Sequence, residues 1–119
     1  MRSSAVVSLD HLDAVPTATL RKELQRLTRT MIFGTLAERG RRCGKPTCRC
    51  VHGEKHPALQ LAHWAGDGKT QSLHVPYVLA DDVRDGVDAW HRFQAIARAL
   101  ADRNRAAVWD GARRRGQIR

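Results

Sequence analysis

Three cysteines fall within eight residues of one polar stretch, and this cluster limits the folds open to the chain more than any other feature. Cys43, Cys48 and Cys50 are followed by His56, in the spacing C-x₄-C-x-C-x₅-H. Structural zinc sites place four ligands at tetrahedral corners, and three thiolates with one imidazole form one of the usual sets. We therefore expect one structural zinc ion, bound by Cys43, Cys48, Cys50 and His56.

Several alternatives to this metal site stay open at the level of sequence. His52 competes with His56 for the fourth place, although three ligands within five residues would make a cramped loop. Three reduced thiols or an iron–sulfur cluster are further options. A catalytic Cys–His pair fits less well, because a nucleophile needs one activated thiol with an orienting partner and nothing singles out one cysteine.

The apolar content of the chain explains why a metal would help it to fold. Leu, Ile, Val and Phe together make up 25 of the 119 residues. A chain of this length corresponds to one domain, and this apolar fraction supports only a thin core. Small domains of this kind are often stabilised by a metal ion or by a partner subunit.

Positive charge is concentrated in two segments. The net charge is +9, with six basic side chains against one acidic side chain in residues 39–55 and four arginines in residues 112–119. A strongly basic surface favours a polyanion as partner, and nucleic acid is the commonest one. The predicted phosphate-binding residues are Arg39, Arg41, Arg42, Lys45, Arg49, Lys55, Arg113, Arg114 and Arg115.

The pattern of apolar residues predicts an α+β fold with a small antiparallel sheet. A short N-terminal helix begins near Pro16 and carries leucines at helical spacing. Residues 32–37 alternate as in a strand, and strands are predicted over residues 58–65 and 69–75, because Gly66-Asp67-Gly68 is a strong hairpin turn signal. We expect Leu59 and Leu61 to share one face, as should Leu73 and Val75.

A long C-terminal helix is predicted over residues 79–110, with Gly111 as its stop. Aspartates crowd its first turns and arginines its far end, as the helix dipole favours. Its predicted apolar stripe consists of Val83, Val87, Trp90, Phe93, Ala97 and Leu100. Together these elements predict a mobile leader over residues 1–15, a single zinc-containing domain over 16–111 and a basic mobile tail over 112–119.

Nothing in the sequence predicts contact with a membrane. No apolar run approaches the ~20 residues that a membrane-spanning helix needs. The N-terminal stretch has only a very short apolar segment and lacks the core of a signal peptide. We therefore expect a cytoplasmic protein, where reduced cysteines are available as metal ligands.

The cysteine motif also resembles that of a known family. The stretch from Arg41 to Cys50, with Gly34-Thr35-Leu36 before it and Gly53-Glu54-Lys55-His56 after it, resembles a family of small bacterial proteins of unknown function. Its members share a GSL-x₃-Y-R-R-C-G-K-x₂-C-R-C-x₅-H core and are often encoded beside transposases. The resemblance extends from residue 34 to about 108 and implies the same metal ligands. The chain departs from it at Gly40, where the family has Tyr, and at residues 57–61, where the family tends to have aromatics.

These features lead to one main hypothesis of function and one alternative. The main hypothesis is a zinc-finger-like nucleic-acid-binding module, for DNA rather than RNA, that serves as an accessory to a mobile element. The alternative is a protein–protein adaptor in which Trp90, Phe93 and Trp109 of the long helix pair with a second copy or another protein, while zinc is purely structural. We do not expect an enzyme, because the acids serve the start of one helix and four protein ligands would close the metal site.

Overall fold

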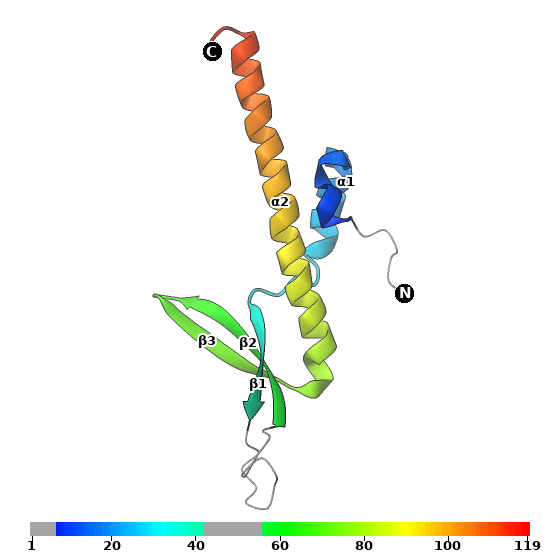
Figure 1. Ribbon diagram of the computed structural model, residues 1–119, viewed down its shortest axis with the longest axis vertical. Coiled ribbons are helices and arrows are strands. Elements are labelled where there is room, and N and C mark those ends of the chain that lie inside the picture. The colour runs from blue at the N-terminus through cyan, green and yellow to red at the C-terminus, as the bar shows by residue number, and fades with distance from the viewer. Residues whose placement is uncertain (1–6, 42–55) are drawn as a thin grey trace, which may run out of the picture. The chain divides into compact units, whose positions relative to one another are not determined.

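The computed structural model describes residues 7–41 and 56–119 and has the predicted α+β composition (Figure 1). A three-stranded antiparallel sheet in the order β1-β2-β3 lies in the chain between a short helix and a long one. The chain divides into two compact units. One contains the described residues up to Met31 and Ala89–Arg119, and the other contains Ile32–Asp88.

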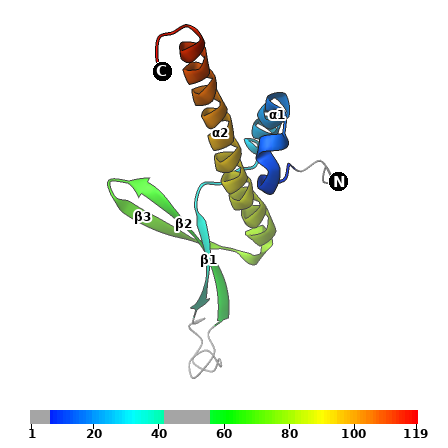
Figure 2. The same ribbon diagram turned by 45° about the horizontal axis from the view of Figure 1, so that its top comes forward.

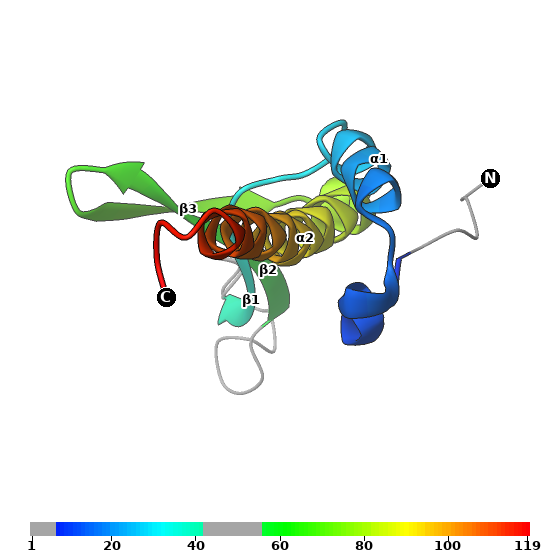
Figure 3. The ribbon, with the colours of Figure 1, turned by 90° about the horizontal axis from the view of Figure 1, so that it is seen from above.

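The helical unit is built from η1 (Leu9–Ala14), α1 (Thr17–Leu27) and most of α2 (Ala80–Arg114). Pro16 immediately precedes α1, as its fixed φ favours. The view along α2 shows η1 and α1 on one side of it (Figure 3). The buried core of this unit consists of Leu20, Leu27, Ala89 and Ile96.

The sheet unit is organised around its central strand. β2 (His56–Gly66) pairs through its first part with β1 (Thr35–Arg41) and through its second part with β3 (Lys69–Val75) (Figure 2). The short η3 (Tyr77–Leu79) follows and leads into α2. The core of this unit consists of Leu59, Leu61, Val75 and Val87, so the first turns of α2 cover one face of the sheet.

Glycine and aspartate set the backbone at two places in the sheet unit. The predicted turn between β2 and β3 is confirmed, with φ of +93°, +52° and +74° at Gly66, Asp67 and Gly68. Gly34 has φ +146°, and a Cβ there would lie 2.7 Å from Leu61 Cδ1. This glycine explains why β1 begins at Thr35 and does not include the predicted positions 32–34.

The buried stripe of α2 matches the predicted one in part. Val87 is buried, and Val83, Phe93 and Leu100 pack against the two cores as predicted. Ala89 at 6% and Ile96 at 0% exposure are buried more deeply than their neighbours Trp90 and Ala97. Trp90 and Phe93 stack on each other with ring centroids 6.0 Å apart. Ala89 and Ile96 share a buried cluster with Leu20 and Leu27 of α1, so this side of α2 packs against α1.

Helical structure extends past both predicted boundaries. η1 lies within the predicted leader, where Ser8 Oγ accepts a hydrogen bond from the Asp10 amide at 3.3 Å. At the other end, α2 passes through Gly111 and ends at Arg114. Gly111 is therefore not a helix stop; the guanidinium of Arg115 lies over it, 3.1 Å from where a Cβ would be.

In the described segments of the chain, no helix has a sufficiently long and apolar stretch to cross a membrane.

Candidate functional site

The predicted metal ligands lie at and within a connection between two paired strands. Cys43, Cys48 and Cys50, with the alternative ligand His52, are outside the described residues. His56 is the first residue of β2. Among residues 7–41 and 56–119, no group of three or more His, Cys, Asp or Glu side chains is arranged to hold a metal.

The ladder between β1 and β2 brings the two ends of this connection together. Arg41, the last residue of β1, is the direct partner of His56 in the antiparallel register. Directly paired residues in such a ladder have Cα atoms about 4.5–5.5 Å apart. Seven consecutive pairs, from Thr35↔Ala62 to Arg41↔His56, hold the two strand ends in place.

The predicted phosphate-binding residues fall into three groups. Arg39 and Arg41 occupy the last positions of β1. Arg113 and Arg114 form the last turn of α2, and Arg115 follows it. The remaining four, Arg42, Lys45, Arg49 and Lys55, lie outside the described residues.

The structure adds a feature that sequence reasoning missed at the end of α2. Arg105, Trp109 and Arg113 are spaced four residues apart and therefore share one side of the helix, here named the Arg–Trp–Arg face. A shallow hollow of about 290 Å³ lies here, lined by these three residues with Ala106 and Asp110. Trp109 is 49% exposed. Its signal in the sequence was the i, i+4 spacing of two arginines around a tryptophan.

Ion pairs hold the two arginines of this face near carboxylates. Arg105 Nη1 lies 3.1 Å from Asp102 Oδ1, and Arg113 Nη1 lies 3.2 Å from Asp110 Oδ1. Asp102 is shared, because Arg98 Nε also donates to it at 3.1 Å. The hydrogen bond from Arg98, with the charges of Arg98 and Arg105, holds the pKa of Asp102 below its usual value. Both arginines of the face remain more than half exposed.

A second hollow, of about 640 Å³, lies in the sheet unit beside the start of α2. Arg84 Nη2 contacts Glu38 Oε1 at 3.0 Å at its wall. Tyr77, 97% exposed, and Val78, 83% exposed, stand at η3 and also line it. An apolar floor with one ion pair suits the recognition of a ligand more than a reaction. The sequence carried no recognisable signal for this hollow, because its residues come from five separate elements.

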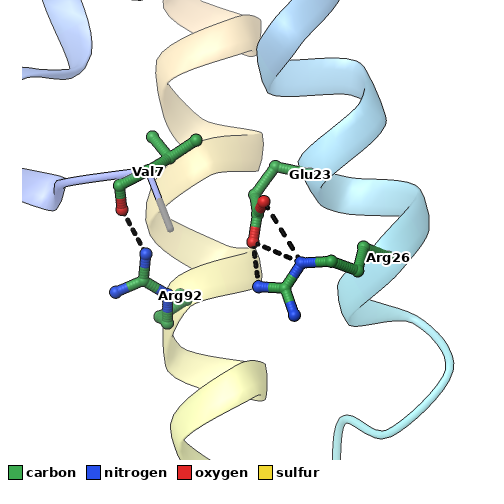
Figure 4. Close-up of polar contacts among 4 residues, drawn as sticks. All are labelled: Val7, Glu23, Arg26 and Arg92. Atoms are coloured by element: carbon green, nitrogen blue, oxygen red, sulfur yellow. Dashed lines mark hydrogen bonds and ion pairs between the residues drawn. The ribbon is translucent and has the colours of Figure 1, made fainter. Parts of the chain in front are cut away.

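Two partly buried polar contacts lie in the helical unit, one within α1 and one between the N-terminal segment and α2 (Figure 4). Glu23, only 5% exposed, accepts a hydrogen bond from Arg26 Nε at 3.1 Å. Arg92 donates from Nη2 to the carbonyl of Val7, and its buried Nε has no hydrogen-bond partner within the described segments. These residues organise the helical unit and are not part of the two hollows.

Comparison with known proteins gives a family and no described activity. A family model described as "Domain of unknown function (DUF6788)" matches residues 14–85. This segment contains the cysteine motif, α1, the whole sheet and the first turns of α2, and it ends before the Arg–Trp–Arg face. No curated protein and no solved structure matches the chain. Because the matched segment is more than half of the sequence, the chain belongs to the family of domains of unknown function DUF6788.

Proposed function

We propose that this chain is a small zinc-containing, nucleic-acid-binding accessory protein whose target is DNA. The resemblance of its cysteine motif to proteins encoded near transposases suggests a bacterial mobile element as its setting. Localisation in the cytoplasm and the absence of a catalytic role are parts of the same proposal.

The pairing of Arg41 with His56 is the observation that carries the proposal. It joins a basic strand end to the predicted fourth metal ligand. The connection between them contains the three cysteines and four further basic residues. Phosphate contacts from short basic segments position a protein on DNA effectively only when the segment is held in one arrangement.

The predicted donor set fits zinc in its chemistry. Cys43, Cys48, Cys50 and His56 provide three thiolates and one imidazole, the set expected for a closed structural site. Bound there, zinc contributes folding free energy to the connection. The protein residues Arg39, Arg41, Arg42, Lys45, Arg49 and Lys55 are then the groups that contact phosphate.

Binding to duplex DNA as a function of salt tests this proposal. If four or five basic side chains contact phosphate, log K against log salt should have a slope of roughly −4 on duplex DNA. Arg41→Ala, Arg42→Ala and Arg49→Ala should each flatten the slope by about one unit, with little dependence on sequence. Fluorescence anisotropy of a labelled duplex across a salt series measures both effects.

The matched control is Cys48→Ser, which retains every basic residue. It should bind duplex DNA more weakly than the wild type, because the arginines lose their arrangement along with the metal. Equal binding by this variant would mean that the charge acts without the metal-held loop. Absence of binding by the wild type at low salt would reject nucleic acid as the partner.

A protein–protein adaptor is the second candidate, and the exposed apolar end of α2 favours it. Val108 and Trp109 are 61% and 49% exposed. Phe93 packs against the core of its own unit and stacks with Trp90, in keeping with their place in the predicted apolar stripe, so Trp109 is the aromatic of this set best placed for an interface. Light scattering that finds a dimer dissociated by Trp109→Ala would support the adaptor.

A further inference from the structure

We propose that the Arg–Trp–Arg face binds single-stranded nucleic acid, with the indole of Trp109 stacked on one unpaired base and Arg105 and Arg113 on the flanking phosphates. The inference rests on the proposed function and adds a second site and a class of target to it. This site lies outside the segment that matches the family and is separate from the cysteine motif.

The first argument is that Trp109 is exposed in the part of α2 that extends beyond its contacts with η1 and α1. Arg103 is the last residue of α2 with a hydrogen bond to η1, α1 or the segment between them in the described chain. Six residues later, half of Trp109 faces solvent beside a hollow. Figure 1 shows this last part of α2 (orange to red) continuing beyond α1. An exposed large aromatic flanked by cations is typical of surfaces that stack nucleobases.

The second argument is the spacing of charge around the ring. Arg105 lies four residues before Trp109 and Arg113 four residues after it. At 1.5 Å per residue, each arginine backbone is about 6 Å along the helix axis from that of Trp109. A nucleotide strand likewise presents one base between two phosphates. Arg114 and Arg115 add positive charge beyond this face, so the strand has a continuous cationic path.

The third argument is that both arginines are free to exchange partners. Their ion pairs are exposed, and such pairs contribute little to stability. When Arg105 turns to a phosphate, Asp102 keeps its hydrogen bond from Arg98. Within the described residues, Asp110 pairs only with Arg113, so its carboxylate competes directly with phosphate for that guanidinium.

A single strand fits this face better than a duplex. In a duplex, both faces of each base are covered by neighbouring base pairs, and exposing one requires unstacking. An unpaired base can stack on the indole at no such cost. Trp109 therefore provides a preference for single strands that basic residues alone would not provide.

The test compares a short oligothymidylate with a duplex of equal length, using the full chain with its metal bound. Trp109→Ala should weaken binding to the single strand about tenfold and leave duplex binding within about twofold. Trp109→Phe should retain most of the affinity, because it keeps an aromatic face. Trp64→Ala is the matched control: Trp64 is 62% exposed at the far end of β2, and its loss should change neither affinity.

Two further measurements separate stacking from a general effect of charge or fold. Oligothymidylate should quench tryptophan emission in the wild type and in Trp64→Phe, but not in Trp109→Phe. Asp110→Asn should strengthen binding to the single strand several-fold, because it removes the competing carboxylate. Asp67→Asn makes the same charge change at the hairpin turn, where asparagine suits the positive φ, and should have a smaller effect.

The outcomes distinguish this inference from the proposed function. If the wild type binds duplex through its cysteine motif but Trp109→Ala binds the single strand as well as the wild type, the stacking site is wrong and the proposed function stands. If Trp109→Ala instead abolishes a dimer without changing nucleic-acid binding, Trp109 contacts a second copy of the chain and not a base. If no nucleic acid binds, both proposals fail.

Discussion

Arg103 donates a hydrogen bond from Nη2 to the carbonyl oxygen of Val15 at 2.7 Å, across 88 positions of the chain. The same nitrogen reaches the carbonyl of Leu12 at 2.8 Å, and Nη1 reaches Thr17 Oγ1 at 2.9 Å. One guanidinium thus contacts Leu12 within η1, the residue before Pro16 and the first residue of α1. It joins the N-terminal segment to α2 where the buried apolar contacts end.

Replacing this arginine should loosen the helical unit. Arg103→Met keeps much of the apolar length but removes all three hydrogen bonds, and we expect the free energy of unfolding to fall by about 1.5–3 kcal/mol. Urea denaturation followed by circular dichroism measures this change. Arg98→Met is the control, because the Arg98 side chain is 76% exposed and, among the described residues, pairs only with Asp102 of its own helix. Its effect should stay within about 0.5 kcal/mol.

The two leucines paired across β2 and β3 should differ greatly in their importance. Leu61 and Leu73 are direct partners in the ladder, yet Leu61 is 7% and Leu73 is 52% exposed. Leu61→Ala should cost about 2–5 kcal/mol of stability, as expected for a buried leucine. Leu73→Ala should cost clearly less, because much of its side chain already contacts water. Similar losses in the two variants would contradict the burial pattern of the sheet.

Acid should remove the contribution of Asp102 to the stability of α2. Because its folded pKa is lowered, mainly by the hydrogen bond from Arg98, this stabilisation is present above the ordinary aspartate pKa of about 3.9 and is lost as the pH falls through the lowered folded value. Asp102→Asn should therefore lower the thermal midpoint at neutral pH. In strong acid, the difference between this variant and the wild type should disappear. A difference that persists there would point to helix propensity instead.

The predicted metal site has a direct analytical test. Protein purified without chelators should carry about one zinc ion per chain, measured by elemental analysis. Cys43→Ser, Cys48→Ser and Cys50→Ser should each lose it, and His56→Ala should lose more metal than His52→Ala. Iron with visible absorbance would indicate a cluster in place of zinc, and the reverse order of the histidines would make His52 the fourth ligand.

The sequence by itself determined the elements whose signals are local. Gly66-Asp67-Gly68 supplies the three positive φ values that the β2–β3 turn needs, so the hairpin follows from residues that are adjacent in the sequence. Pro16 is the residue immediately before α1, as the sequence predicted, and the leucine spacing after it predicts the buried side that includes Leu20 and Leu27. The spacing of the cysteines likewise supports a metal-site prediction without any knowledge of the fold.

Only the tertiary structure decided which positions are deepest and which residues meet. Periodicity narrows the buried stripe of α2 to one side, but the choice of Ile96 over Ala97 depends on where α1 packs. The exposure of Leu73 depends on which part of the sheet α2 covers, and Gly111 remains helical with Arg115 lying over it. The contacts of Arg103 with Leu12 and Val15, and the pairing of Arg41 with His56, join residues distant in sequence. Such contacts depend on how whole elements pack, and a pattern read along the chain reports only on near neighbours.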